Sequence, residues 1–306
     1  MSFSGMYNTQ GMLFLLMLLG LLLKKLHRIT REGEAFLTDL VLYVTLPASI
    51  LKSFQMELTG ELLRSCLKVL ILTVALLAAS FLAGKLAFRF LPREKRKIME
   101  YASVVSNAGI LGNPVAEGIF GSQGLMYASI YTIPLRLYMW SFGLMCFTKA
   151  PDAKTLLKKT CTHPCMLAAV LGLILMSLRI SLPEVLEKTV RSVAGANTCL
   201  SMLLVGTILA SVPLKSIADG KALYYSGVRL LLLPFLALLL CRVADCDSLV
   251  TGVMVTLTGM PAGSTTAVLA QKYGCDAELA AKCVVLSTML SMASVPFWCM
   301  IVSCMG

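Results

Sequence analysis

The chain has 306 residues, of which 58% are hydrophobic and 14% are charged, whereas soluble domains carry about 25% charged residues. This composition excludes an ordinary soluble domain and predicts a polytopic α-helical protein with the lipid bilayer as its partner, because roughly 20 apolar residues span a bilayer as a helix. The net charge of +11 does not indicate a nucleic-acid partner, since the basic residues gather between apolar runs, as membrane topology requires.

The first apolar run covers residues 1–23. No basic residue precedes it, and the basic cluster KKLHRITR follows it. A secretory signal peptide has the opposite order of charge. We therefore expect a first membrane helix with the amino terminus outside the cytoplasm.

Taken in chain order, the apolar runs predict ten membrane helices. They cover residues 9–26, 34–54, 62–88, 98–120, 123–147, 161–180, 193–213, 220–242, 249–271 and 279–304.

The charges of the connecting segments give these helices an orientation. One side carries 17 lysines and arginines and the other side carries 5, when the segments are assigned alternately. The basic side faces the cytoplasm by the positive-inside rule. A multi-pass protein of the cell membrane with both termini extracytoplasmic is the resulting prediction.

Ten helices divide into two sets of five, so the second set enters the membrane from the opposite side. This arrangement is an inverted repeat, which is common among transporters. We expect the first repeat at residues 1–150 and the second at residues 151–306. The basic, polar segment around Lys149–Lys159 is the predicted joint.

Two similar polar segments interrupt the fourth helix of each half. Residues 106–118 read SNAGILGNPVAEG, and residues 257–267 read LTGMPAGSTTA. Glycine weakens a helix, and proline removes a hydrogen-bond donor and clashes with the preceding turn. Backbone groups freed at membrane depth must be buried in protein or line a wet cavity. The free N–H groups at the start of a half-helix suit an anion, and the free carbonyl groups at its end suit a cation.

Matching interruptions in the two halves are the best sequence indication of a transport site. The alternative interpretation is an ordinary proline kink in each helix. The predicted substrate-binding residues at the interruptions are Asn107, Gly112, Asn113, Pro114, Gly259, Pro261, Ser264, Thr265 and Thr266.

Four further residues, Arg136, Glu117, Pro47 and Asn197, extend this candidate site. Arg136 lies deep in the fifth predicted helix, where an ionisable group is a functional hypothesis by default. It is either a counter-charge for an anionic substrate, a fixed cation in the place where related carriers bind sodium, or a structural partner of a carboxylate or of carbonyl groups. Glu117 is either a proton-coupling carboxylate or an interfacial charge. Pro47, which we expect to break the second helix, and Asn197 either line the substrate cavity or join helices, as small polar residues do. Arg229, nearer the cytoplasmic end of its helix, is expected to extend its charge to the interface.

The motif N-x-G-x-x-G-x-P at residues 107–114, together with LYVTLPASIL at residues 42–51 and GMPAGSTTA at residues 259–267, resembles the auxin efflux carrier family over the whole chain. The resemblance implies an all-α, bile-acid-symporter-like membrane fold in which the broken helices 4 and 9 cross. It implies a transport unit of helices 3–5 and 8–10, and a scaffold of helices 1, 2, 6 and 7 that often forms a homodimer. The implied substrates are small organic anions, such as dicarboxylates or indole acids, carried by alternating access.

Two other functions are alternatives to the transport of organic anions. A sodium-coupled symporter of the bile-acid type is the main alternative, and a non-transporting receptor on the same fold is another. An enzyme is not expected, because the chain lacks paired deep aspartates, H-E-x-x-H and a deep histidine. The CTHPC sequence at residues 161–165 has no second cysteine pair nearby, so no metal is expected. No cofactor is expected either, and the coupling ion is left as H⁺ or Na⁺.

Overall fold

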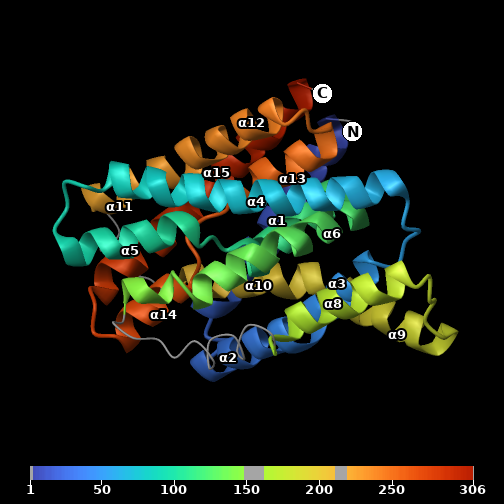
Figure 1. Cartoon of the computed structure of the whole chain (residues 1–306). Helices are drawn as coiled ribbons and strands as arrows, with labels where there is room; N and C mark the ends of the chain where they lie inside the picture. Colours follow the sequence, from blue (N-terminus) through green and yellow to red (C-terminus); the bar gives the residue numbers. More distant parts are fainter. Residues whose placement is uncertain (1–2, 148–161, 211–218, 306) are drawn as a thin grey trace. The chain divides into compact units, whose positions relative to one another are not determined.

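The computed structural model describes residues 3–147, 162–210 and 219–305. These residues form helices and no strand, with a single isolated β-bridge between Ser106 and Ala262. The all-helical prediction is confirmed (Figure 1). The predicted joint at Lys149–Lys159 and the last residues of the predicted helix 193–213 lie outside the described residues. The helices are α1 (Phe3–Lys25), α2 (Arg31–Leu40), α3 (Leu46–Ser53), α4 (Gly60–Ala87), α5 (Arg93–Val104), α6 (Asn113–Trp140), α8 (Pro164–Ser177), α9 (Glu184–Gly195), α10 (Asn197–Ala210), α11 (Gly220–Gly227), α12 (Leu233–Val243), α13 (Ser248–Thr258), α14 (Thr265–Lys272) and α15 (Ala277–Met305), with a short 3₁₀ turn at Leu144–Cys146 and π-helical turns at Val41–Thr45, Ala108–Gly112 and Val228–Leu232.

Among the described residues, five helical segments are long and apolar enough to cross a membrane. Large apolar side chains also point outward from them, including Ile71 at 66% and Leu82 at 58% exposure. A soluble protein rarely exposes such apolar faces, so a multi-pass membrane protein is supported. The number of ten membrane helices stays a prediction. The five segments are Arg31–Ser53, Gly60–Ala87, Glu184–Ala210, Gly220–Val243 and Ala277–Cys304.

Three prolines of the chain follow a π-helical turn by two residues. The turn Val41–Thr45 precedes Pro47, Ala108–Gly112 precedes Pro114, and Val228–Leu232 precedes Pro234. A wider turn accommodates the proline ring and the missing N–H group without ending the helix. Residues 40, 41, 45 and 46 all keep right-handed helical dihedral angles. The expectation that Pro47 breaks the second helix was therefore wrong.

The helix α6 contains the expected boundary between the fourth and fifth predicted helices. Gly121 has φ +70° and ψ −164°, and the helical dihedral angles stop there. Glycine adopts a positive φ at no steric cost. Residues 113–120 and 122–140 are thus two helices joined by a one-residue bend.

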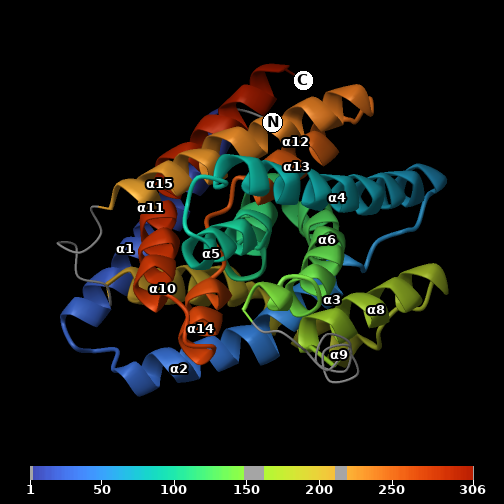
Figure 2. The same cartoon turned by 60° about the vertical axis from the view of Figure 1, so that its left-hand side comes forward.

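The residues divide into two compact units by their internal contacts. The first unit consists of Met1–Lys68, Gly109–Ile130 and Cys161–Ser211, and the second of Val69–Ala108, Tyr131–Thr160 and Val212–Gly306. In the first unit, α1 packs along α10, and α3 packs against α8 and α9. In the second unit, α13 packs against α12 and α15, and α14 packs against α15 and α5 (Figure 2).

Backbone contact without intervening side chains joins α1 and α10. A Cβ atom on Gly20 would lie 2.1 Å from the Leu203 carbonyl oxygen, and one on Gly206 would lie 2.0 Å from the Met17 carbonyl oxygen. Small residues at helix interfaces permit such close approach in membranes. These two glycines therefore set the spacing of the pair.

Candidate functional site

The first helix interruption lies at residues 105–107. The helix α5 ends at Val104, Val105 is extended with φ −87° and ψ 103°, and helical structure resumes at Ala108. The sequence placed this interruption at Gly112–Pro114, where the chain is helical instead. Gly112 ends the π-helical turn, and Asn113 and Pro114 open α6, in the first turn where proline is tolerated.

The second interruption covers residues 259–264, as the Gly259-Met260-Pro261 sequence predicted. The helix α13 ends at Thr258, and α14 begins at Thr265 after the cap residue Ser264. Pro261 has no N–H group, so it cannot donate the backbone hydrogen bond to residue 257 that a continuous α-helix would need.

The two interruptions meet inside the second unit. Ser106 and Ala262 form an antiparallel bridge. The Asn107 N–H donates to the Pro261 carbonyl at 2.8 Å, and the Gly263 N–H donates to the Val105 carbonyl at 3.0 Å. These bonds satisfy backbone groups that the broken helices leave free, which the interior of a membrane requires.

Arg229 connects the carbonyl ends of the two broken helices. Its side chain is 1% exposed. Its Nε donates to the Met260 carbonyl at 2.9 Å, and its Nη1 donates to the Ser103 carbonyl at 2.5 Å. The expectation that Arg229 extends its charge to the interface was wrong, because the π-helical turn at residues 228–232 carries the side chain against the interruptions.

Tyr225 stands one helical turn before Arg229 and caps a neighbouring carbonyl. Its hydroxyl donates to the Ala102 carbonyl at 2.8 Å. Residues four apart share a helix face, so Tyr225 and Arg229 together satisfy two of the carbonyl groups that α5 leaves free at its end. Sequence reasoning missed this pair, although an arginine within the apolar segment Gly220–Val243 was a signal.

The start of α14 presents hydroxyl groups beside the second interruption. The Thr265 hydroxyl lies 3.3 Å from the Tyr101 hydroxyl. The Thr266 hydroxyl oxygen is buried and has no hydrogen-bond partner among the described residues. Arg136, in the second part of α6, belongs to the same unit and is 9% exposed. This unit therefore carries the predicted residues Asn107, Arg136, Gly259, Pro261, Ser264, Thr265 and Thr266.

A separate polar group lies in the first unit. The Thr45 hydroxyl donates to the Asn197 Oδ1 at 3.2 Å, and the Ser201 hydroxyl donates to the same atom at 3.4 Å. Asn197 opens α10 and is fully buried. Its Nδ2 has no partner among the described residues. Pro47 lies two residues beyond Thr45, in the first turn of α3.

Glu117 also belongs to the first unit and lies beside the end of α3. The Ser49 hydroxyl donates to its carboxylate at 3.0 Å, and the Lys52 ammonium lies 3.7 Å away. Asn113, one turn earlier in α6, is fully buried, and neither amide atom has a partner among the described residues. The first unit thus carries the predicted residues Gly112, Asn113, Pro114, Glu117, Pro47 and Asn197.

Metal-binding side chains do not gather in the described ranges, where no group of three His, Cys, Asp or Glu residues could hold an ion. In the CTHPC sequence, Cys161 lies outside the described residues. His163 caps α8, because its Nδ1 accepts the Cys165 N–H at 3.3 Å.

Comparison with known families gives a match over residues 11–299 to the family described as "Membrane transport protein". The chain belongs to this family. It is the family of the auxin efflux carriers, which the motifs at residues 107–114 and 259–267 indicated. The transporter is therefore a multi-pass membrane protein.

Three relatives show the extent of the similarity. An uncharacterized transporter of Methanothermobacter thermautotrophicus is 30% identical over 97% of this chain and 99% of its own length. The uncharacterized transporter YfdV of Escherichia coli K12 is 22% identical over 94% of each chain. A protein of Rhizobium meliloti described as "Putative malonate transporter" is 24% identical over 92% of this transporter and 91% of its own length.

Proposed function

We propose that this transporter carries small organic anions across the membrane by alternating access, with dicarboxylates such as malonate as the first class to test. The binding region is the junction of the two helix interruptions. The observation that carries the proposal is the buried Arg229, which holds carbonyl groups at the ends of both broken helices.

The electrostatics of the junction favour an anion. The carboxyl end of a helix carries about half a negative elementary charge and the amino end about half a positive one. Arg229 offsets the negative ends of α5 and α13. We expect the carboxylate of the substrate at the positive start of α14, beside the hydroxyls of Thr265 and Thr266. Arg136 supplies a further positive charge in the same unit.

We propose roles for the remaining predicted residues accordingly. In the second unit, Asn107 and Ser264 donate hydrogen bonds to the anion, and Gly259 and Pro261 shape the backbone around it. In the first unit, Asn113 is a candidate substrate-binding residue with a buried amide, and Gly112 and Pro114 shape the backbone on either side of it. Pro47 and Asn197 line its path. Glu117 is the candidate proton-coupling group, because Ser49 and Lys52 hold its carboxylate within the helical bundle of the first unit.

The larger architecture forms part of the same proposal. Ten membrane helices form two inverted repeats, residues 1–150 and 151–306, with the broken helices crossing and both termini extracytoplasmic. Helices 3–5 and 8–10 act as the transport unit and helices 1, 2, 6 and 7 as a scaffold, through which a homodimer forms. Helices 1, 2 and 6 fall in the first unit and helices 8–10 in the second, which supports this division, whereas Gly109–Ile130, from predicted helices 4 and 5, belongs to the first unit.

Sodium-coupled symport is less well supported. A sodium ion needs several oxygen ligands, and carbonyl groups at a helix interruption are the expected source. The guanidinium of Arg229 already binds the Ser103 and Met260 carbonyls. Proton coupling or exchange is therefore the proposed mode, and no observation favours a receptor or an enzyme.

Uptake into liposomes tests the function. Purified protein should accumulate labelled malonate saturably, in competition with other dicarboxylates, under an imposed proton gradient but not under a sodium gradient alone. The absence of uptake of every dicarboxylate and indole acid tested would overturn the proposal.

An Arg136→Ala variant tests the recognition of the anion. We expect kcat/KM for malonate to fall at least about tenfold, because a hydrogen bond to a charged group contributes about 1.5–3 kcal/mol. The matched control is Arg242→Ala, which removes an exposed arginine at the end of α12. Equal uptake by the Arg136 variant and the control would remove Arg136 from the site.

A further inference from the structure

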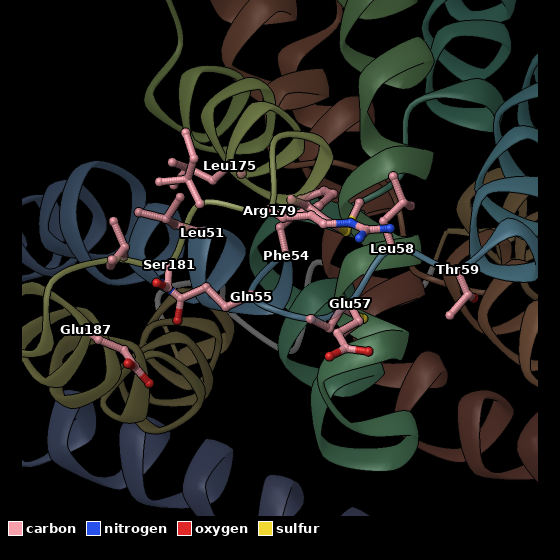
Figure 3. A pocket seen from close by; sticks show the side chains of 15 residues that line it. Leu51, Phe54, Gln55, Glu57, Leu58, Thr59, Leu175, Arg179, Ser181 and Glu187 are labelled. Atoms are coloured by element: carbon pink, nitrogen blue, oxygen red, sulfur yellow. The ribbon is translucent and has the colours of Figure 1, made fainter.

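A cavity of about 600 Å³ opens in the first unit, among the ends of its helices. Its lining includes Phe54, Glu57 and Thr59, from the connection between α3 and α4, and Arg179 and Ser181, from the connection between α8 and α9 (Figure 3). Its volume is within the range of ligand-binding pockets, about 300–1,000 Å³. None of the proposed transport residues lines it.

The cavity lies at the ends of three candidate membrane segments. The segment Arg31–Ser53 ends beside it, Gly60–Ala87 begins beside it, and Glu184–Ala210 begins beside it. The ends of such segments lie where the hydrocarbon core meets the lipid headgroups. The occupant is therefore expected to have both an apolar part and a headgroup.

Arg179 occupies a backbone position that normally belongs to glycine. The helix α8 ends in a Schellman motif, in which the Ile180 N–H donates to the Leu175 carbonyl at 2.9 Å and the Arg179 N–H donates to the Met176 carbonyl at 3.2 Å. The residue at this position has φ +55°. A left-handed conformation costs a non-glycine residue about 1–2 kcal/mol. Such strain at a charged residue is a reason to look for a function.

The charged side chains that line the cavity are Arg179, Glu57 and Glu187. Neither Arg179 nor Glu57 forms an ion pair with another described residue, whereas the lining residue Glu187 is paired with Arg191 at 2.6 Å. In Figure 3 the guanidinium of Arg179 reaches toward Leu58, and the carboxylate of Glu57 points away from it. The two groups match a ligand that carries a negative and a positive charge.

One wall of the cavity is apolar and suits the hydrocarbon part of a ligand. Phe54 is 1% exposed and packs on Gly172, where an added Cβ would lie 2.7 Å from the phenyl ring. Leu51, Leu175 and Met176 continue this wall.

We propose that this cavity is a binding site for a membrane phospholipid with a zwitterionic phosphoethanolamine headgroup. The Arg179 guanidinium donates to the phosphate, the Glu57 carboxylate accepts from the ammonium, and an acyl chain lies along Phe54 and Leu175. Phosphatidylglycerol lacks the ammonium, and phosphatidylcholine has no N–H group to donate, so both bind more weakly.

Native mass spectrometry of the purified full chain tests the site, with phosphatidylethanolamine, phosphatidylcholine and phosphatidylglycerol of identical acyl chains as probes. We expect the wild type to retain phosphatidylethanolamine preferentially. Glu57→Gln should remove the preference over phosphatidylglycerol, and Arg179→Gly should weaken retention of both lipids about tenfold or more, as expected for the loss of a charge-assisted hydrogen bond. The matched control is Lys188→Gln, which removes an exposed lysine of α9 that is paired with Glu184.

Thermal unfolding separates binding from folding. Because glycine is unstrained at positive φ, Arg179→Gly should raise the melting temperature of the lipid-free protein while abolishing the shift caused by added phosphatidylethanolamine. Unchanged lipid retention in Arg179→Gly and Glu57→Gln would overturn the proposal. An equal shift with water-soluble glycerophosphoethanolamine would also overturn it, because the occupant would then not be a membrane lipid.

Discussion

Arg229 is the single side chain on which the junction of the interruptions most depends. Arg229→Met would leave the Ser103 and Met260 carbonyls buried without a donor. We expect a loss of about 3–5 kcal/mol in the free energy of unfolding, the range for breaking a buried charged interaction. Arg229→Lys should recover part of this loss, because an ammonium cannot reproduce the planar fork of the guanidinium. Chemical unfolding in detergent measures both changes.

The control for this prediction is Arg28→Met, at an exposed position between α1 and α2. It should unfold like the wild type. An Arg229→Met protein as stable as this control would show that the two carbonyls are satisfied in another way.

The sequence predicted one of the two helix interruptions at its exact residues and misplaced the other. Gly259-Met260-Pro261 marked the second interruption correctly, because proline cannot join a helical ladder. The first interruption falls at residues 105–107, which contain neither glycine nor proline. It depends on bonds to Pro261 and Gly263, and such distant partners are not visible in a local pattern. For the same reason the burial of Arg229 could not be read from its position along the helix.

At the scale of helices, the close pairing of α1 and α10 depends on Gly20 and Gly206. We expect Gly206→Ala to lower the free energy of unfolding by about 1–3 kcal/mol, because overpacking forces the two backbones apart. Thermal unfolding of the purified protein measures this. The control is Gly11→Ala in the partner helix α1, where an added Cβ would meet no atom within 4 Å. That change should be neutral or slightly stabilising, and equal effects of the two changes would contradict the packing argument.

The π-helical turn before Pro234 has a specific partner. The Leu230 carbonyl, four residues before the proline, loses its usual helical donor. The Trp298 Nε1 donates to it at 2.8 Å. Trp298→Phe should therefore destabilise the protein by about 1–3 kcal/mol, the cost of a buried carbonyl without a partner.

A double-mutant cycle isolates this contact from the packing of the indole ring. In a Pro234→Ala background, residue 234 regains an N–H group that can serve the Leu230 carbonyl, so Trp298→Phe should cost less than in the wild type. Additive effects of the two changes would show that the indole contributes packing alone.

At the scale of the whole molecule, Glu117 gives a prediction about energy coupling. We expect Glu117→Gln to abolish accumulation of malonate driven by a proton gradient, while exchange of internal for external malonate continues, because exchange requires no net proton movement. Counterflow and gradient-driven uptake in the same liposomes distinguish the two. Full gradient-driven accumulation in the variant would leave Glu117 with a structural role beside Ser49 and Lys52. The control is Glu184→Gln, at an exposed pair on α9.

Hydropathy predicted the class of the molecule well, because a membrane helix needs a length of apolar sequence that few other structures share. The family follows from motifs spread over both halves of the chain. The number of membrane helices was inferred from apolar runs and the inverted repeat from that number, and both stay predictions. The cavity at Arg179 had no signal in the sequence, since its walls come from helix ends and two loops about 120 residues apart that only folding brings together.

The bridge between Ser106 and Ala262 has a consequence for biosynthesis. The backbone groups of Val105 and Asn107 obtain their partners only when Pro261 and Gly263 have left the ribosome. Until then this stretch of the nascent chain enters the membrane with backbone groups that lack hydrogen-bond partners. The insertion machinery must keep these groups in a polar environment. Production of the protein should accordingly respond to the supply of membrane insertase and to the speed of translation through the second half.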